Sequence, residues 1–483
     1  MLFNSYIFIF LFLPLSLLGW YGLNRIGAYK AAGLYLTAMS LWFYGYFNIS
    51  YLILMVVSIG GNYLISLLMD KKVIKGRIAL AMGLLLNLGL LFYFKYYDFF
   101  ISNINAVFKT GFNLKNILLP LGISFFTFQQ LSYIIDRYKG KAVHYSFIEY
   151  AAFVTFFPQL VAGPIVLHSE FVPQFDDVAK RRFNPEMFYE GLISFVIGLS
   201  KKVLLADTLA VIVNKGFDNY LLLDTFSTVI VMAAYFLELY FDFSGYSDMA
   251  IGMGLMFGIK LPVNFNSPYK SASLKELWTR WHMTLTRFMT TYVYIPLGGS
   301  RKGKARTYLN VFIVFVLSGL WHGAAWTYVV WGVFTGIIVI WDNLGLIKPG
   351  RRLGVLMTDI TFTLLLIPFR SPDLGVAAAM FRNLIKGWTG NVLRLATDTM
   401  NMPELYVPLQ ITERLLPGKE PVVNVILMFV LIGIGMIVIA GQNAQYIRQN
   451  LASKKYTPPV LALLFIYSVI SFSRVSTFIY FNF

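Results

Sequence analysis

Apolar stretches long enough to cross a lipid bilayer recur along the whole chain. Clear examples lie at residues 6–23, 51–69, 78–94, 422–441 and 460–472. A helix needs about 20 mostly apolar residues to cross a hydrocarbon core about 30 Å thick. We therefore expect an all-α, polytopic integral membrane protein with roughly ten to twelve transmembrane helices. Only 13% of the residues are charged, against about 25% in typical soluble domains, which agrees with this expectation.

The first apolar stretch should be a retained helix with its N-terminus outside. The preceding residues, MLFNS, carry no lysine or arginine, whereas a cleavable signal peptide has a basic region there. Counting forward from that orientation places the basic segments 71–77 and 136–145 in the cytoplasm, where the positive-inside rule expects them.

The formal net charge is +17, yet the distribution of this charge argues against nucleic-acid binding. Lysine and arginine occur in short clusters between apolar segments instead of on one soluble face. We interpret the clusters as signals for membrane orientation, some of which also contact anionic lipid headgroups or an anionic cytosolic ligand.

The chain contains no cysteine, which excludes disulfides, thiolate metal sites and a cysteinyl acyl-enzyme. No internal repeat or flexible linker divides the sequence. We expect one integral membrane domain over residues 1–483, with amphipathic or re-entrant helices near 375–420.

Two acidic residues interrupt an apolar stretch. Glu238 and Asp242 are one helical turn apart, so they would project to the same side of a helix. Because ionisable side chains within the membrane are costly, they usually face a cavity or a partner. One interpretation is that they form the polar floor of a cavity. The other is that Asp242 hydrogen-bonds a neighbouring helix end, Ser244 or Tyr246.

A second polar stretch spans residues 261–308. Its first part should be irregular backbone buried in protein, because four residues there break helical periodicity: Pro262, Asn264, Asn266 and Pro268. Ser273 and Glu276 then have the spacing of a capping box. The helix that they open should carry Trp278, Arg280, Trp281 and His282. His282 belongs either to an aromatic anchor at the membrane interface or to a polar site.

Residues 298–305, GGSRKGKA, nearly spell a Walker A loop. Ala305 occupies the position of the Mg²⁺-binding Ser or Thr and no βαβ unit surrounds it, which argues against ATP hydrolysis. The loop carries four basic residues that should be cytoplasmic: Arg301, Lys302, Lys304 and Arg306. They either set the topology alone or hold the phosphates of a cytosolic donor.

His322 lies in SGLWHGAAW (318–326), between two stretches that otherwise read as membrane helix. The three small residues after it would leave space beside the ring, and Trp321, Trp326 and Trp331 would form rigid walls. A neutral imidazole in such a slot can accept a proton from a hydroxyl, since its ordinary pKa is about 6.5. The alternative is a structural hydrogen bond between helices.

The remaining histidines, His144 and His168, carry weaker signals. No pair of histidines has the spacing of a helical metal site, and no acidic motif completes a ligand set. We predict no metal ion and no bound cofactor.

Together these stretches resemble the membrane-bound O-acyltransferase family and, within it, the alginate O-acetyltransferase branch. The matching segments follow a consistent order over most of the chain: FFPQLVAGPI (156–165), YFDFSGYSDMAIG (240–252), NFNSPY (264–269), LWTRWHMTL (277–285), YVYIPLGGSRKG (292–303), SGLWHGAAW (318–326) and FIYFNF (478–483). Teichoic-acid D-alanyl transferases look similar around the first family histidine.

The resemblance implies a helical shell around a funnel or tunnel that crosses the bilayer. In that fold His322 of the WHG motif would be catalytic, and His282 would be a second polar residue of the site. The implied donor is an acyl-CoA, acetyl-CoA in this branch, and the implied location is the inner (cytoplasmic) membrane. Members of this type commonly work with a separate periplasmic or extracellular acetyltransferase. The candidate binding residues are Asp242, Asn264, Arg280, Trp281, Trp321, Arg301 and Lys302.

Two departures from the family pattern concern the acceptor or the partner. Many relatives read W-L-R-D-Y after the RWH motif, where this chain has FMTTY (288–292). An arginine often follows the AGPI segment, where this chain has VLHSEF (166–171). Neither departure touches His282 or His322.

The sequence therefore predicts acetyl transfer from cytosolic acetyl-CoA to a hydroxyl outside the membrane, with His322 as general base. Transfer of D-alanyl or another acyl group to a cell-wall polymer is an alternative. A polysaccharide transporter without chemistry would also use polar residues at membrane depth and broken helices. A membrane scaffold for a polysaccharide synthase is a third possibility.

Overall fold

The computed structural model describes residues 1–346, 349–400, 406–415, 417–473 and 478–479. Within these residues the regular structure is helical and no strand occurs, which confirms the all-α prediction. The chain divides into two compact units. The N-terminal unit comprises residues 1–196, 247–264 and 290–292, and the C-terminal unit comprises 197–246, 265–289 and 293–483. The single domain expected over 1–483 stays a prediction, so each unit is described by itself.

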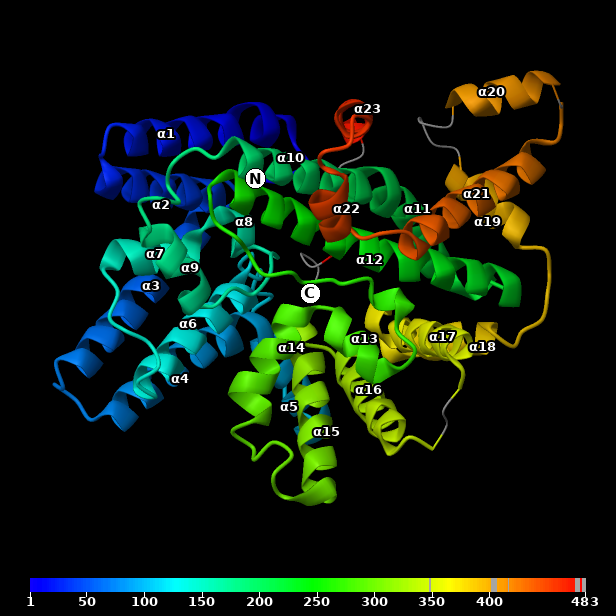
Figure 1. The fold of residues 1–483 in the computed structure, drawn as a ribbon. Helices are drawn as coiled ribbons and strands as arrows, with labels where there is room; N and C mark the ends of the chain where they lie inside the picture. Colours follow the sequence, from blue (N-terminus) through cyan, green and yellow to red (C-terminus); the bar gives the residue numbers. More distant parts are fainter. Residues whose placement is uncertain (347–348, 401–405, 416, 474–477, 480–483) are drawn as a thin grey trace. The chain divides into compact units, whose positions relative to one another are not determined.

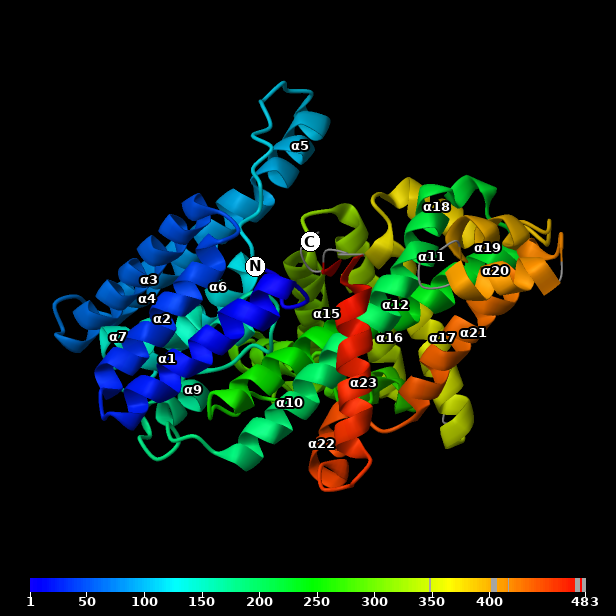
Figure 2. The ribbon, with the colours of Figure 1, turned by 90° about the horizontal axis from the view of Figure 1, so that it is seen from above.

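The N-terminal unit is built from helices that pack around an aromatic core. In chain order they are η1 (Phe8–Phe12), α1 (Leu13–Arg25), α2 (Tyr29–Gly45), α3 (Ile49–Asp70), α4 (Gly76–Leu91), η2 (Phe92–Tyr96), α5 (Tyr97–Phe108), α6 (Ile123–Tyr138), α7 (Phe147–Thr155), α8 (Phe157–Leu160), α9 (His168–Asp176) and most of α10 (Pro185–Ser200). The short loop after α1 returns the chain, so α1 and α2 lie side by side (Figures 1 and 2). Phe12 packs edge-on against Phe157 with ring centroids 5.1 Å apart.

Buried amides join α3, α4, α6 and α7 of this unit. Asn87 Nδ2 donates to Asn62 Oδ1 at 2.6 Å, and Asn62 Nδ2 donates to Gln130 Oε1 at 3.0 Å. Gln130 in turn donates to the Ser58 hydroxyl and accepts from the Tyr150 hydroxyl. Because lipid offers amides no hydrogen bonds, such pairing between helices stabilises the bundle.

The C-terminal unit contains the remaining elements. They are η3 (Lys201–Ala206), α11 (Asp207–Asp218), η4 (Tyr220–Leu222), α12 (Thr225–Met256, which gives residues to both units), η5 (Pro268–Lys270), α13 (Leu274–Arg280), α14 (Met283–Met289), η6 (Thr290–Tyr294, whose first three residues belong to the N-terminal unit), α15 (Gly303–His322), α16 (Trp326–Leu344), α17 (Arg351–Arg370), α18 (Leu374–Asn383), α19 (Val392–Met400), α20 (Tyr406–Leu415), α21 (Glu420–Ala440), α22 (Ala444–Leu451), α23 (Thr457–Ile470) and η8 (Ser471–Ser473). The short helices α18 to α20 occupy the region expected to be amphipathic or re-entrant.

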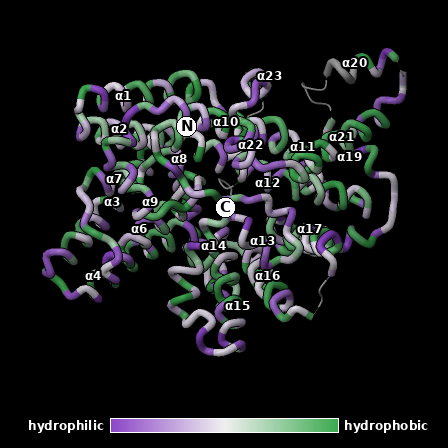
Figure 3. Tube along the Cα trace, viewed as in Figure 1, coloured by the Kyte–Doolittle hydropathy of each residue, from purple (hydrophilic) through white to green (hydrophobic). Residues whose placement is uncertain are grey.

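Seven helical stretches of the described chain are long and apolar enough to cross a bilayer. They are Phe8–Arg25, Ile49–Asp70, Gly76–Phe108, Thr225–Met256, Trp326–Leu344, Arg351–Arg370 and Glu420–Ala440. Figure 3 shows hydrophobic residues along most helices and hydrophilic residues in connecting loops. The helix Thr457–Ile470 is apolar but shorter, and α2 has 17 residues. These two helices explain part of the difference between the seven long helical stretches and the expected ten to twelve transmembrane helices. The total number of transmembrane helices stays a prediction.

Glycines allow α15 and α16 to pack closely, and the two helices lie side by side (Figure 1). A Cβ atom added at Gly332 of α16 would lie 2.6 Å from the backbone oxygen of Phe315 on α15. A Cβ at Gly319 of α15 would lie even closer to the backbone oxygen of Tyr328. Close approach at small residues is a common way to pack membrane helices. It also sets the position of the segment that joins α15 to α16.

The substitution Gly332→Ala should destabilise the protein, because the added methyl group forces the two helices apart at a cost of about 1–3 kcal/mol. The matched control is Gly433→Ala in α21, where no atom lies within 4 Å of the added carbon. Alanine is the better helix former, so the control should keep or raise the melting temperature. Equal melting temperatures of the two purified variants in detergent would contradict the close packing.

Candidate functional site

His322 is the last residue of α15, and three small residues outside any helix follow it. Gly323 has φ −163° and ψ 151°, Ala325 has φ −147° and ψ 154°, and α16 begins at Trp326. The 20 residues of α15 extend about 30 Å at 1.5 Å per residue. His322 and the basic loop with Arg301 therefore lie at opposite ends of one helix, and that helix is about as long as the hydrocarbon core is thick.

Aromatic rings enclose the His322 imidazole. Its centroid lies 4.9 Å from that of Trp321, 5.3 Å from that of Trp331 and 5.1 Å from that of Phe369. His322 is 6% exposed. Trp321 and Trp331 pack beside the ring as expected, whereas the third expected tryptophan, Trp326, is half-exposed. Phe369 of α17 supplies a wall that the sequence analysis missed, because it is distant in the chain.

His282 lies in a break between α13 and α14. The Ser273 hydroxyl accepts from the backbone N–H of Glu276 at 3.1 Å, as the capping box predicts. The Glu276 carboxylate accepts from Ala272 instead of Ser273, so the box is only half formed. The prediction that the helix carries Trp281 and His282 is wrong, because α13 ends at Arg280 and Trp281 is extended.

The backbone of His282 is strained. Its φ of +44° is a left-handed value that residues other than glycine seldom adopt, and such values occur often at functional sites. His282 is 1% exposed, and burial lowers its pKa to about 3, so the ring is neutral at pH 7. Its ring packs edge-on against Phe243 at 4.7 Å.

Trp321 brings the two family histidines together. Its ring centroid lies 6.0 Å from that of His282 and 4.9 Å from that of His322. Two imidazoles that are forty positions apart in the sequence thus share one indole neighbour. The shared neighbour agrees with one site that contains both residues, and their chemical roles stay predictions.

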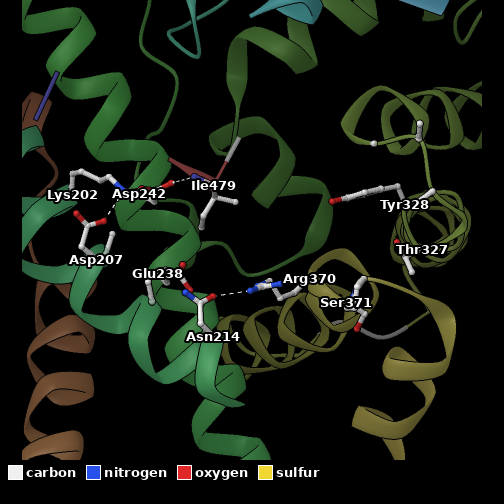
Figure 4. Close-up of a pocket in the computed structure, with 16 residues that line it drawn as sticks. Lys202, Asp207, Asn214, Glu238, Asp242, Thr327, Tyr328, Arg370, Ser371 and Ile479 are labelled. Carbon is white, nitrogen blue, oxygen red and sulfur yellow. Dashed lines mark hydrogen bonds and ion pairs between the residues drawn. The ribbon is translucent and has the colours of Figure 1, made fainter. Parts of the chain in front are cut away.

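A cavity of about 640 Å³ adjoins His322 within the C-terminal unit (Figure 4). The small residues that follow His322 form part of its wall: Gly323, Ala324 and Ala325. The charged and polar lining residues are Lys202, Asp207, Asn214, Glu238, Asp242, Thr327, Tyr328, Arg370 and Ser371. His322 itself is not among the lining residues, but it directly precedes Gly323, which is. The volume is within the usual range for small-molecule sites, roughly 300–1,000 Å³.

An ion triad occupies one side of the cavity. Lys202 Nζ lies 2.6 Å from Asp207 Oδ1 and 2.6 Å from Asp242 Oδ1, as Figure 4 shows. Asp242 Oδ2 also accepts from the backbone N–H of Ile479 at 2.9 Å. Glu238 and Asp242 both line the cavity, so the geometry agrees with the polar-floor interpretation. Lys202 was missed, although a lysine within an apolar stretch was an available signal.

The other candidate binding residues lie outside this cavity lining. Trp281 is buried against Phe265 and Tyr269, at centroid distances of 5.1 and 5.9 Å. Arg280 forms an ion pair with Glu276 at 3.0 Å. These contacts agree with structural roles for both residues.

Three further candidates are also not among the residues that line the cavity. Arg301 and Lys302 are exposed in the loop before α15. Asn264 is buried in the N-terminal unit, where its Nδ2 donates to the Ser247 hydroxyl at 3.3 Å. Of the motif FIYFNF (478–483), residues 480–483 lie outside the described part of the chain.

The N-terminal unit holds a separate polar cluster around His168. Its Nε2 lies 3.2 Å from Asp136 Oδ2, and its Nδ1 lies 2.9 Å from the Tyr145 hydroxyl. Tyr292 also donates to Asp136 Oδ2 at 2.7 Å. Burial raises the pKa of Asp136, but the hydrogen bonds from His168 and Tyr292 outweigh it and hold that pKa below its usual value. The sequence analysis ranked His168 as weak and missed these partners, which come from other segments.

No group of three or more His, Cys, Asp or Glu side chains within the described ranges is arranged to hold a metal ion. The predicted absence of a metal stays a prediction. The arrangement around His322 instead provides an enclosed imidazole next to a cavity with hydrogen-bonding and charged walls.

Comparisons with known proteins agree with the motifs. The model of the membrane-bound O-acyltransferase family matches residues 38–346. A peptidoglycan O-acetyltransferase of Helicobacter pylori is 43% identical over 70% of this chain and 69% of its own. A probable alginate O-acetylase AlgI of Pseudomonas aeruginosa is 40% identical over 82% of this chain and 77% of its own. A teichoic acid D-alanyltransferase of Streptococcus thermophilus is 30% identical over 48% of this chain and 59% of its own.

The match to the family model includes both His282 and His322 and covers well over half of the chain. The length of this match and the apolar helices confirm the resemblance to the membrane-bound O-acyltransferase family that the motifs indicated. The chain therefore belongs to the membrane-bound O-acyltransferase family and is a multi-pass membrane acyltransferase.

Proposed function

We propose that the protein moves acetyl groups from cytosolic acetyl-CoA across the inner membrane for O-acetylation of an extracytoplasmic polysaccharide of alginate type. One observation carries this proposal. The imidazole of His322 is enclosed by aromatic rings, and the next residue in the chain, Gly323, lines a polar cavity. The names of two relatives support acetyl as the transferred group.

His322 acts as general base in this proposal. It takes the proton from the acceptor hydroxyl as that oxygen attacks the carbonyl carbon of the thioester. The C–S bond then breaks, and the proton passes to the departing thiolate. In this proposal the neutral His282 stabilises the carbonyl oxygen as it becomes negative, an effect that is large where water is excluded. The aromatic rings around His322 provide that exclusion.

The donor enters from the basic loop and the acceptor from the His322 end of α15. Arg301 and Lys302 are exposed, together with neighbouring basic residues, and they attract and hold the phosphates of acetyl-CoA. The thioester must therefore enter the protein to meet the acceptor hydroxyl at His322. A separate periplasmic or extracellular acetyltransferase places the group on the polymer.

Transfer of a D-alanyl group to a cell-wall polymer is the second candidate, because one relative is named a teichoic acid D-alanyltransferase. The two candidates differ in the acyl group that the protein accepts. Vesicles with the purified protein should take label from acetyl-CoA and not from a D-alanyl thioester if the first proposal holds. Label that crosses intact as CoA or sugar would instead indicate a transporter.

His322→Ala should abolish the release of CoA from labelled acetyl-CoA and the acetylation of the acceptor. Loss of a general base lowers rates by about 10²–10⁴-fold, while the small side chain leaves membrane insertion intact. The matched control is His144→Ala in the N-terminal unit, which should keep full activity. A correctly folded His322→Ala protein that still acetylates would refute the assignment.

His282→Asn should lower the transfer rate by about 10²-fold or more while preserving the melting temperature. Asparagine tolerates a positive φ, so this variant removes the imidazole and keeps the strained backbone, whereas a lost oxyanion donor costs about 10²–10³-fold. His282→Val is the matched contrast, since a β-branched residue at this φ should lower the melting temperature. A fully active Asn variant would assign His282 a structural role.

A variant with Gln at all four basic positions of the loop should have a raised KM for acetyl-CoA and little change in kcat. The positions are Arg301, Lys302, Lys304 and Arg306. The difference should shrink at high salt, because screening weakens contacts between exposed charges. Lys454 and Lys455, both exposed, provide a control pair for the loss of surface charge. An unchanged KM in the loop variant would exclude the loop from donor binding.

A further inference from the structure

Asn310 is a buried amide on α15 that the proposed mechanism does not use. None of its surface is exposed, at 0%. Its Nδ2 atom donates to two backbone oxygens, that of Gly299 at 2.9 Å and that of Leu297 at 3.4 Å. Both oxygens belong to the basic loop, which spans residues 295–306 and includes the first turn of α15. One side chain of the helix therefore holds the loop at two points.

Arg306 holds the same part of the loop. Its Nη2 and Nε atoms donate to the Leu297 oxygen at 3.3 and 3.4 Å. Arg306 is half-buried, whereas the other three basic residues are exposed: Arg301, Lys302 and Lys304. Arg306 thus differs from these three, since the loop itself engages its guanidinium.

The backbone of the loop forms a tight turn of its own. The N–H of Gly299 donates to the oxygen of Tyr294 at 3.0 Å, and the N–H of Gly298 donates to that of Ile295 at 3.0 Å. Gly299 has φ +55°, a left-handed value that glycine adopts without steric cost. The turn and the two side-chain contacts together give the loop a defined shape before a ligand binds.

This arrangement favours the binding of an anion. A backbone oxygen carries partial negative charge and repels a phosphate. The oxygens of Leu297 and Gly299 instead face the buried amide of Asn310. The exposed side chains of Arg301 and Lys302 are left for the ligand. A loop that already has its bound shape also loses less conformational entropy on binding, which strengthens the affinity.

We propose that Asn310 is a positioning residue for the donor, and that together with Arg306 it holds the basic loop in the shape that receives the phosphates of the CoA nucleotide. This inference rests on the proposed function, which assigns the loop to acetyl-CoA. Asn310 lies twelve residues before His322 on the same helix, about 18 Å along the helix axis. It therefore acts on donor binding, and the chemistry stays with His322.

Steady-state kinetics of the purified full-length protein test this role. Asn310→Ala should raise KM for acetyl-CoA about tenfold, equivalent to about 1.4 kcal/mol. The kcat should stay unchanged, because the variant weakens donor binding without touching His322. Adenosine 3′,5′-bisphosphate is the phosphorylated nucleotide of CoA without the thioester arm, and it should inhibit the parent protein competitively against acetyl-CoA. Its inhibition constant should rise in the variant by the same factor as KM.

Asn383→Ala is the matched control. Asn383 is also buried, and its Nδ2 donates to a backbone oxygen outside its own helix, that of Tyr220, at 2.6 Å. Loss of this contact should change neither KM nor the inhibition constant.

If Asn310→Ala does not fold, Gly303→Val tests the same loop. Gly303 has φ +83°, and no atom lies within 4 Å of a carbon added there. A β-branched residue at this φ distorts the loop without a clash, so KM and the inhibition constant should again rise at constant kcat.

A raised KM and a raised inhibition constant at constant kcat would support the positioning role. The role would be overturned by a KM or an inhibition constant that stays unchanged, by a fall in kcat as large as the rise in KM, or by a bisphosphate that does not inhibit an active parent protein. Each of these results leaves the assignment of His322 intact. A parent protein that does not use acetyl-CoA would instead overturn the proposed function, and this inference with it.

Discussion

A polar or charged group among membrane helices must find its partner within the protein, because lipid offers none. This constraint explains how distant segments of the chain are joined. In the C-terminal unit, Lys202 lies between Asp207 and Asp242 and so ties η3 and α11 to α12. In the N-terminal unit, Asn62 and its amide neighbours join four helices in the same way. Each pairing removes the free-energy cost of an unpaired polar group and adds a specific contact between helices.

The same constraint governs the breaks in the helices. Non-helical backbone in a membrane protein is tolerated where protein covers it, and both family histidines are buried at or beside a helix break. His282 has strained backbone in the break between α13 and α14, and His322 ends α15 directly before three residues that are not helical. Trp321 lies beside both rings. The breaks thus leave two imidazoles beside one indole ring.

The surroundings of His322 combine two environments. Aromatic rings of Trp331 and Phe369 cover the imidazole, while the small residues after it form the wall of a polar cavity. A general base benefits from a dry setting, since electrostatic interactions strengthen when water is excluded. A hydroxyl-bearing substrate, in contrast, needs hydrogen-bonding walls. Glu238 and Arg370 provide such walls in the same unit as the histidine.

The sequence alone determined the helical membrane class and most span positions, and it singled out the two histidines as candidates, because apolar runs, helix breakers and family motifs are local patterns. Glu238 and Asp242 were likewise predictable as neighbours on one helix face, since a helix repeats every 3.6 residues. The tertiary structure decided which residues meet across long separations. Three residues of the cavity or of the His322 surroundings come from segments that carry no motif: Lys202, Phe369 and Arg370. The predicted binding residues Trp281 and Arg280 instead make contacts that agree with structural roles. Packing and charge compensation are properties of several segments at once, so no local pattern could have assigned them.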